Sequence, residues 1–133
     1  MGYISDLSGE ISINEDLKFG DHRKLMKAKV AKTLDGQVPS DYDVYVDYEQ
    51  AFEDAGDYTA VRFVAAEIRP YYSSMKAYTI MEDVQRIVDL LGPGYTYSGA
   101  IEVDGEESGD LWRIYVRNGK AVAVRPEIVW PDE

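Results

Sequence analysis

Hydrophobic and polar residues alternate with a period of two through the C-terminal part of the chain. The alternation runs over 111–117 and resumes after Asn118-Gly119, a pair that favours a two-residue type I′ turn because both central residues take positive φ. A similar run covers 95–103. The pattern predicts a three-stranded antiparallel meander over residues 95–129.

Three earlier segments also follow the pattern of β-strands. Residues 8–13 alternate over a short length, and 41–49 carry apolar residues on one parity and mainly acidic residues on the other. Residues 58–69 are apolar on both parities, which favours a central position in the sheet. Arg62 lies among these apolar residues and is expected to pair with an acid such as Asp47.

One segment has the period of an amphipathic helix, with apolar residues at Ile80, Val84, Ile87, Val88 and Leu91. Ser73, Ser74 or Thr79 can cap its start, and Gly92-Pro93-Gly94 ends it. A thinner apolar stripe predicts a short helix over 21–32. The order of elements predicts one α+β domain over 1–133, with a mostly antiparallel sheet of five to six strands and one main helix packed on one face.

Composition limits the chemistry available to the chain. It has 133 residues, 45% of them hydrophobic, and no cysteine, which excludes disulfides and thiolate metal sites. We find no signal peptide, no apolar run of the ~18 residues that a membrane span needs, and no P-loop or dinucleotide fingerprint. The sequence therefore predicts a cytoplasmic protein with no cofactor.

The charge is strongly negative and unevenly distributed. A net charge of −11 disfavours direct binding to nucleic acid or to an anionic membrane. Residues 33–61 contain no lysine or arginine and eight acids. One interpretation is a solvated acidic surface that keeps the protein soluble. The other is a partner-binding surface made of Asp41, Asp43, Tyr45, Asp47, Glu49, Glu53, Asp54 and Asp57.

The preceding residues 18–32 contain six cations, and five of them form an alternative anion-binding set: Lys18, Arg23, Lys24, Lys27 and Lys29. This segment is either a solvated basic face or a contact for a small ligand such as a nucleotide or another phosphorylated molecule, in a protein that could form homo-oligomers. Whether the basic and acidic segments lie against one another is open at the level of sequence.

Other candidate sites have weaker support. The single histidine, His22, has no nucleophile-elbow pattern around it, so a catalytic triad is not predicted. Four carboxylates at Asp104, Glu106, Glu107 and Asp110 indicate a solvated loop, or alternatively a calcium or magnesium site or a weak carboxylate enzyme. Of the eleven tyrosines, five fall on faces expected to be buried: Tyr42, Tyr48, Tyr58, Tyr95 and Tyr97.

Both ends of the chain resemble a family of small uncharacterised proteins found in actinobacteria and their phages. The residues that carry the resemblance are Met1–Ser5 with Gly9–Ile11, Glu107–Arg113 and Pro126–Pro131. The resemblance implies a soluble intracellular protein, for which a phage gene is one consistent origin. Together with the acidic segment, it favours a non-enzymatic binding or inhibitory protein that docks on a basic protein, such as a nucleic-acid-binding protein.

Overall fold

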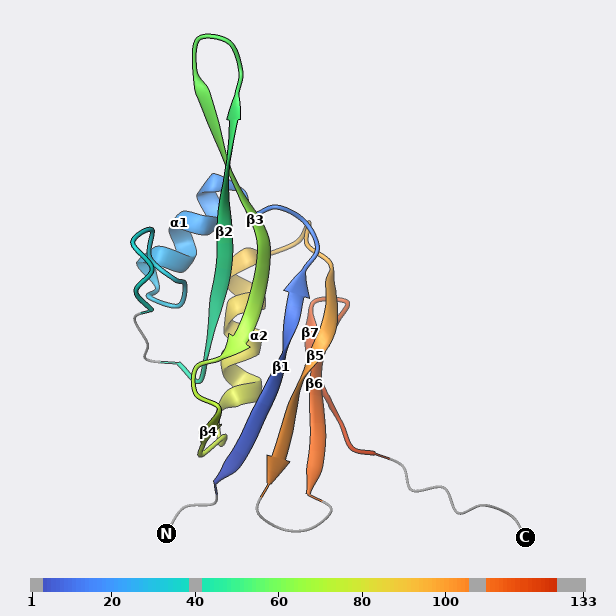
Figure 1. Ribbon diagram of the computed structural model, residues 1–133. Helices are drawn as coiled ribbons and strands as arrows, with labels where there is room; N and C mark the ends of the chain where they lie inside the picture. Colours follow the sequence, from blue (N-terminus) through green and yellow to red (C-terminus); the bar gives the residue numbers. More distant parts are fainter. Residues whose placement is uncertain (1–3, 39–41, 106–109, 127–133) are drawn as a thin grey trace, which may run out of the picture.

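The computed structural model describes residues 4–38, 42–105 and 110–126 (Figure 1). This described part contains seven strands and two helices. In chain order they are β1 (Ser5–Ile13), α1 (Phe19–Lys27), β2 (Val44–Asp54), β3 (Thr59–Pro70), β4 (Ser74–Met75), α2 (Ile80–Leu91), β5 (Tyr97–Gly105), β6 (Leu111–Arg117) and β7 (Lys120–Val124). Within these residues, no helix combines the length and the apolar character needed to cross a membrane.

The strands form one open antiparallel sheet in the order β2-β3-β1-β5-β6-β7, and the short β4 pairs with β1. The predicted α+β class, with its mostly antiparallel sheet, is thus confirmed. β1 lies in the middle, between strands that are far away in the sequence. The N-terminal strand therefore joins a β2–β3 hairpin to a β5–β6–β7 meander.

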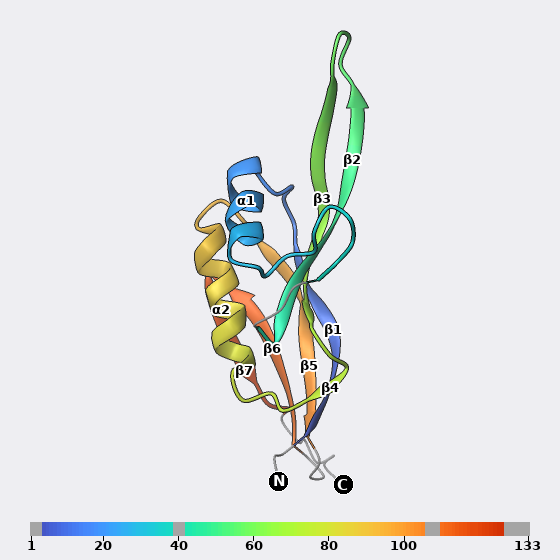
Figure 2. The ribbon, with the colours of Figure 1, turned by 90° about the vertical axis from the view of Figure 1, so that its left-hand side faces the viewer.

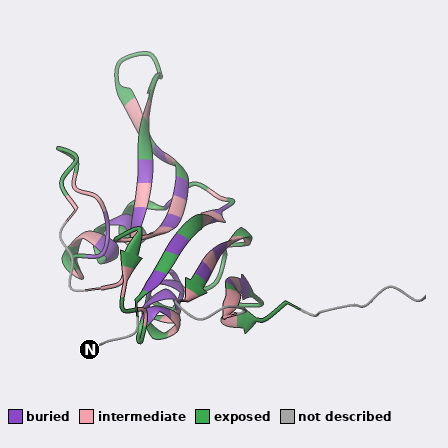
Figure 3. Cartoon of the chain, turned by 60° about the horizontal axis from the view of Figure 1, so that its bottom comes forward, coloured by how far each residue is buried: buried purple, intermediate pink, exposed green. Residues whose placement is uncertain are grey.

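Both helices lie on the same face of the sheet (Figure 2). Ile11, Ile68 and Ile101 come from three neighbouring strands and are fully buried on that face. α2 presents Ile80, Val84, Ile87, Val88 and Leu91 to the same core. Figure 3 shows the buried and exposed bands that alternate along the strands, as period-two alternation requires.

The C-terminal hairpin has the predicted turn and register. Asn118 and Gly119 have φ of 52° and 74°, and Arg117 pairs with Lys120. The last part of the predicted meander, residues 127–129, lies outside the described residues.

The later of the alternative helix starts is the observed one. α2 begins at Ile80 with Thr79 as its N-cap residue, and Gly92 follows its end with a φ of 70°. Ser74 instead belongs to the two-residue strand β4, where it pairs with Asp6 of β1. Sheet pairing therefore uses Ser74 and Met75, and residues 76–79 connect them to the helix.

A β-bulge divides the β2–β3 hairpin. Asp47 pairs with Glu67 but Glu49 pairs with Val64, so Tyr48 stands opposite two residues of β3. The extra residue, Ala65, has a φ of 52°. Because the bulge changes the parity of β3, its buried residues are Phe63, Ala66 and Ile68 rather than a strict alternating set.

Candidate functional site

The β2–β3 hairpin extends beyond the packed body of the protein (Figure 1). We call residues 49–62 the hairpin arm. The arm begins immediately beyond the bulge and closes around Gly56, where the Ala55 amide donates to the Tyr58 carbonyl at 2.9 Å. None of its residues is buried, so the arm is a two-stranded ribbon held mainly by its own backbone pairing.

Carboxylates dominate the charge of the hairpin arm. Its four acids, Glu49, Glu53, Asp54 and Asp57, are all exposed. The only cation in the arm is Arg62, whose Nη1 lies 2.8 Å from Glu53 Oε1. The other end of that guanidinium, Nη2, lies 2.6 Å from Asp16 Oδ2, so Arg62 is already shared between two acids.

These contacts correct the expectation that Arg62 pairs with Asp47. In the observed register Arg62 stands opposite Ala51, on the far side of the bulge from Asp47. Glu53 and Asp16 both raise the pKa of Arg62 through hydrogen bonds and their negative charge. The remaining three acids of the arm form no ion pair with a described residue.

The arm also exposes two aromatic side chains. Phe52 is 65% exposed, and Tyr58 is 67% exposed. The prediction that Tyr58 is buried is wrong, because it lies at the tip of the arm, beyond any element that could cover it. Tyr48 is buried as predicted, whereas Tyr42, Tyr95 and Tyr97 are only partly buried.

An aromatic cluster fixes the base of the arm to α1. The imidazole of His22 stacks on Phe63 with ring centroids 3.9 Å apart, and Tyr48 meets His22 edge-on at 4.8 Å. The Tyr48 hydroxyl donates to the Lys32 carbonyl at 2.6 Å. Phe19 contacts Phe63 edge-on yet stays 64% exposed, so it extends the apolar surface from the base.

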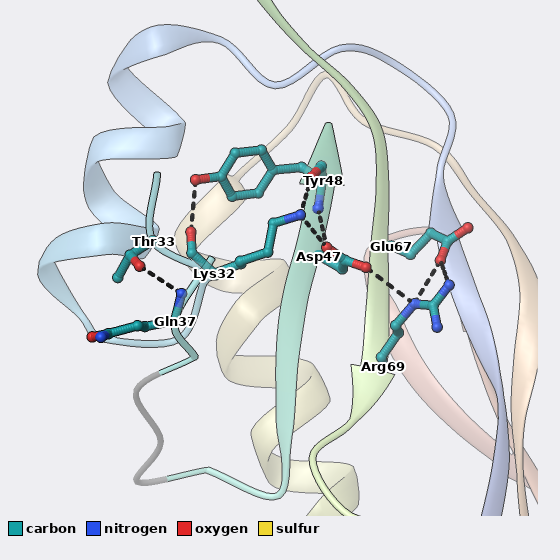
Figure 4. A network of polar contacts seen from close by, with 7 residues as sticks. All are labelled: Lys32, Thr33, Gln37, Asp47, Tyr48, Glu67 and Arg69. Carbon is teal, nitrogen blue, oxygen red and sulfur yellow. Dashed lines mark hydrogen bonds and ion pairs between the residues drawn. The ribbon is translucent and has the colours of Figure 1, made fainter. Parts of the chain in front are cut away.

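Below the arm, the acidic and basic segments meet in a network of ion pairs (Figure 4). Lys32 Nζ lies 2.8 Å from Asp47 Oδ1, and Arg69 Nε lies 3.6 Å from Asp47 Oδ2. Arg69 also pairs with Glu67 at 2.6 Å. Asp47 therefore has two cationic neighbours, and its charge is compensated within the fold.

Asp43 also makes contacts inside the fold. Its amide donates to Asp83 Oδ2 at 2.9 Å, and the Thr79 hydroxyl donates to its Oδ2 at 3.0 Å. Burial raises the pKa of Asp43, although the Thr79 hydrogen bond opposes the shift. Tyr45 is partly buried and meets Tyr71 edge-on at 6.1 Å, while Asp41 lies outside the described residues.

The predicted acidic set thus divides into two groups. Asp43, Tyr45 and Asp47 lie against the packed body, whereas the other four described acids stand on the arm. Sequence reasoning did not single out Phe52 and Phe19. A usable signal for the arm was the length of the two strands on either side of Gly56. β2 has 11 residues and β3 has 12, whereas the neighbouring strand β1 has nine, so part of the hairpin extends beyond β1.

The five predicted anion-binding cations lie in and around α1. Arg23, Lys24, Lys27 and Lys29 are exposed, and Lys24 pairs with Asp21 at 3.4 Å. Lys18 precedes the helix, where its amide donates to the Tyr95 hydroxyl at 3.0 Å.

The predicted cation-binding loop is only partly described. Asp104 is exposed, and Asp110 pairs with Arg125 at 2.9 Å. Glu106 and Glu107 lie outside the described residues. Within the described ranges, no three histidine or acidic residues are grouped as metal ligands would be.

Comparison with known proteins gives a family but no function. All of residues 1–133 match a family of unknown function, DUF6205. The chain belongs to that family. No curated protein and no solved structure matches it. The match fits the expectation of an uncharacterised family and covers the whole chain.

Proposed function

We propose that this DUF6205 protein is a non-enzymatic binding protein whose hairpin arm docks on a basic surface of a partner protein. The observation that carries the proposal is the arm itself, which exposes four carboxylates and two aromatic rings beyond the packed body. Aromatic side chains supply contact area in protein interfaces, and surrounding charge steers the encounter.

The partner we propose is a nucleic-acid-binding protein in the cytoplasm. Its basic surface would accept the arm carboxylates in place of phosphates, and the protein would act as an inhibitor of that surface. A gene carried by an actinobacterium or by its phage, as in the proteins that the chain ends resemble, would suit such a role.

The test compares two double charge reversals that change net charge equally. Glu49→Lys with Asp57→Lys alters the arm, whereas Asp6→Lys with Asp104→Lys alters exposed carboxylates of β1 and β5. Asp43 and Asp47 are unsuitable because both are bonded within the fold. Each protein is used to capture partners at low and high salt, with folding checked by circular dichroism.

We expect wild type and the body variant to capture the same basic protein at low salt and to release it at high salt, because salt screens exposed charges. The arm variant should capture none. Added duplex DNA should compete for the captured partner. Equal capture by both variants, or a captured protein that is not basic, would contradict the proposal.

A further inference from the structure

A separate cavity of about 710 Å³ opens where α2 ends. It lies between the residues that follow this helix, the start of β5 and the β6–β7 turn. Its volume falls in the range of ~300–1,000 Å³ that is typical of small-molecule sites. It shares no residue with the hairpin arm.

Aromatic and apolar residues form part of the cavity wall, beside the polar residues Asp89, Thr96, Arg117 and Asn118. Pro93, Tyr95 and Tyr97 contribute ring surfaces, and Val88 and Val116 contribute aliphatic ones. Such a lining favours a flat apolar ligand because ring faces stack well on tyrosine and proline.

Hydrogen bonds hold both sides of the cavity in place. On one side, the Tyr95 hydroxyl donates to Asp21 Oδ2 at 2.6 Å, which ties this wall to α1. On the other side, the Gln85 side chain donates to the Gly119 carbonyl at 3.0 Å and accepts from the Ala121 amide at 2.8 Å. The cavity is therefore formed before any ligand arrives, which lowers the entropic cost of binding.

The charged groups at the cavity differ in the contacts that they make with other side chains. Asp89 accepts a hydrogen bond from Gln85 Nε2 at 2.9 Å. Arg117 is exposed and forms no ion pair with any residue in the described part of the chain. Lys18 does not line the cavity, although its amide donates to the hydroxyl of the lining residue Tyr95 at 3.0 Å.

We propose that this cavity binds a small aromatic molecule that carries an anionic group. The ring packs between the tyrosines and the aliphatic wall, and the anion faces Arg117. This inference does not depend on the hairpin arm or on the proposed protein partner.

The test uses two probes with the same ring and opposite charge, indole-3-acetate and tryptamine. Backbone amide signals of the full-length protein are followed by NMR as each probe is added. We expect indole-3-acetate to shift the signals of Thr96, Arg117 and Gly119 in a saturable way. Tryptamine should shift them less and bind at least about fivefold more weakly, since the difference is one exposed charge contact.

Three variants then separate charge recognition from nonspecific binding. Arg117→Gln should weaken the binding of indole-3-acetate about fivefold. The control is Lys120→Gln, which should leave the affinity unchanged, because Lys120 pairs with Arg117 in the sheet but does not line the cavity. Asp89→Asn should strengthen binding because it removes a negative charge from the wall. Saturation by neither probe, tighter binding of tryptamine, or equal effects of the Arg117 and Lys120 changes would overturn the proposal.

Discussion

Two side chains of the described core bury a polar atom that has no hydrogen-bond partner: His22, through Nε2, and Tyr97, through its hydroxyl. A buried polar atom without a partner costs free energy because it loses its bonds to water. His22 belongs to the aromatic cluster beneath the hairpin arm, whereas Tyr97 is one of the residues that line the cavity. We expect a separate effect on stability from a substitution at each of the two residues.

His22 should make the protein less stable in mild acid. Burial lowers its pKa below the usual 6.5, so the unfolded chain takes up a proton at a higher pH than the folded protein does. The free energy of unfolding is therefore highest above pH 6.5 and falls as the pH drops below this value. Chemical denaturation of wild type and His22→Phe between about pH 7 and 5 measures this, since phenylalanine keeps the stack on Phe63 without titrating.

The variant should show a smaller loss of stability over that range. Equal slopes for the two proteins would mean that His22 does not titrate differently in the folded and unfolded states.

Tyr97→Phe should raise the free energy of unfolding by about 1 kcal/mol. The change removes a buried hydroxyl without a partner and keeps the ring that packs in the core. Burial also raises the pKa of Tyr97 to about 12, as expected for a hydroxyl held away from water. Tyr95→Phe is the matched control and should be destabilising, because the Tyr95 hydroxyl bonds both Asp21 and the Lys18 amide. Destabilisation by Tyr97→Phe would instead indicate a bound water on the hydroxyl.

At the scale of the elements, α2 is joined to the edge strand β2 by a buried carboxylate. Asp83 is 2% exposed, accepts the Asp43 amide at 2.9 Å and pairs with Arg86 Nη1 at 2.9 Å. Thr79, the residue before the helix, bridges to Asp43 from the same end. Two hydrogen bonds thus join the start of α2 to the residue before β2.

Asp83→Ala should lower the free energy of unfolding by about 1–3 kcal/mol, because it leaves the Asp43 amide without its acceptor. Glu82→Ala removes a carboxylate from the adjacent, exposed position and should cost at most about 0.5 kcal/mol. Urea denaturation of both variants gives the comparison. Similar losses for the two would show that the buried contact contributes nothing beyond the helix dipole.

At the bulge of β3 we expect a substitution to stabilise the protein. Ala65 has a φ of 52°, where a side chain is strained and glycine is not. Ala65→Gly should therefore stabilise the protein, by about 0.5–1 kcal/mol. Ala51→Gly, in the neighbouring strand and without positive φ, should destabilise it by a similar amount. Thermal unfolding of the pair checks the prediction, which fails if both changes destabilise.

Elements that depend on short-range signals could be predicted from the sequence. Asn118-Gly119 specifies its own turn, and the stripe from Ile80 to Leu91 specifies a helix together with the face it buries. The strand order could not be predicted, because nothing in residues 5–13 indicates that β1 pairs with both β3 and β5. The bulge could not be predicted either, because the residue with positive φ is Ala65 and not a glycine, which would have indicated a bulge.

At the scale of the whole molecule, the charge of a sequence segment differs from the charge that the same segment exposes on the folded surface. The 29 residues without a cation suggest one acidic surface, but Lys32 and Arg69 reach Asp47 from other parts of the chain. Asp43 bonds to Asp83 of α2 and to Thr79, the residue before that helix. Such pairings join distant segments, so they could not be predicted from the composition of either segment. Within the predicted partner-binding set, the described acids that remain available to a partner are those on the arm.

The hairpin arm should be separable from the fold. Residues 52–61 can be replaced by Asn-Gly, which joins Ala51 to Arg62, a pair that stands in register. None of the excised residues is fully buried and only Val61 packs partly against the core, so the melting temperature should stay within about 3 °C of wild type. Partner capture should be lost, because the excision removes Phe52, Tyr58 and three of the four arm carboxylates.

The same variant should still bind indole-3-acetate, since the cavity lies in the body of the protein and shares no residue with the arm. Loss of partner capture with probe binding retained would assign the two activities to different parts of one molecule. Retained capture would place the partner surface on the body instead, where Asp6 and Asp104 are exposed carboxylates. A large fall in melting temperature would show that the arm stabilises the core, which its exposed residues argue against.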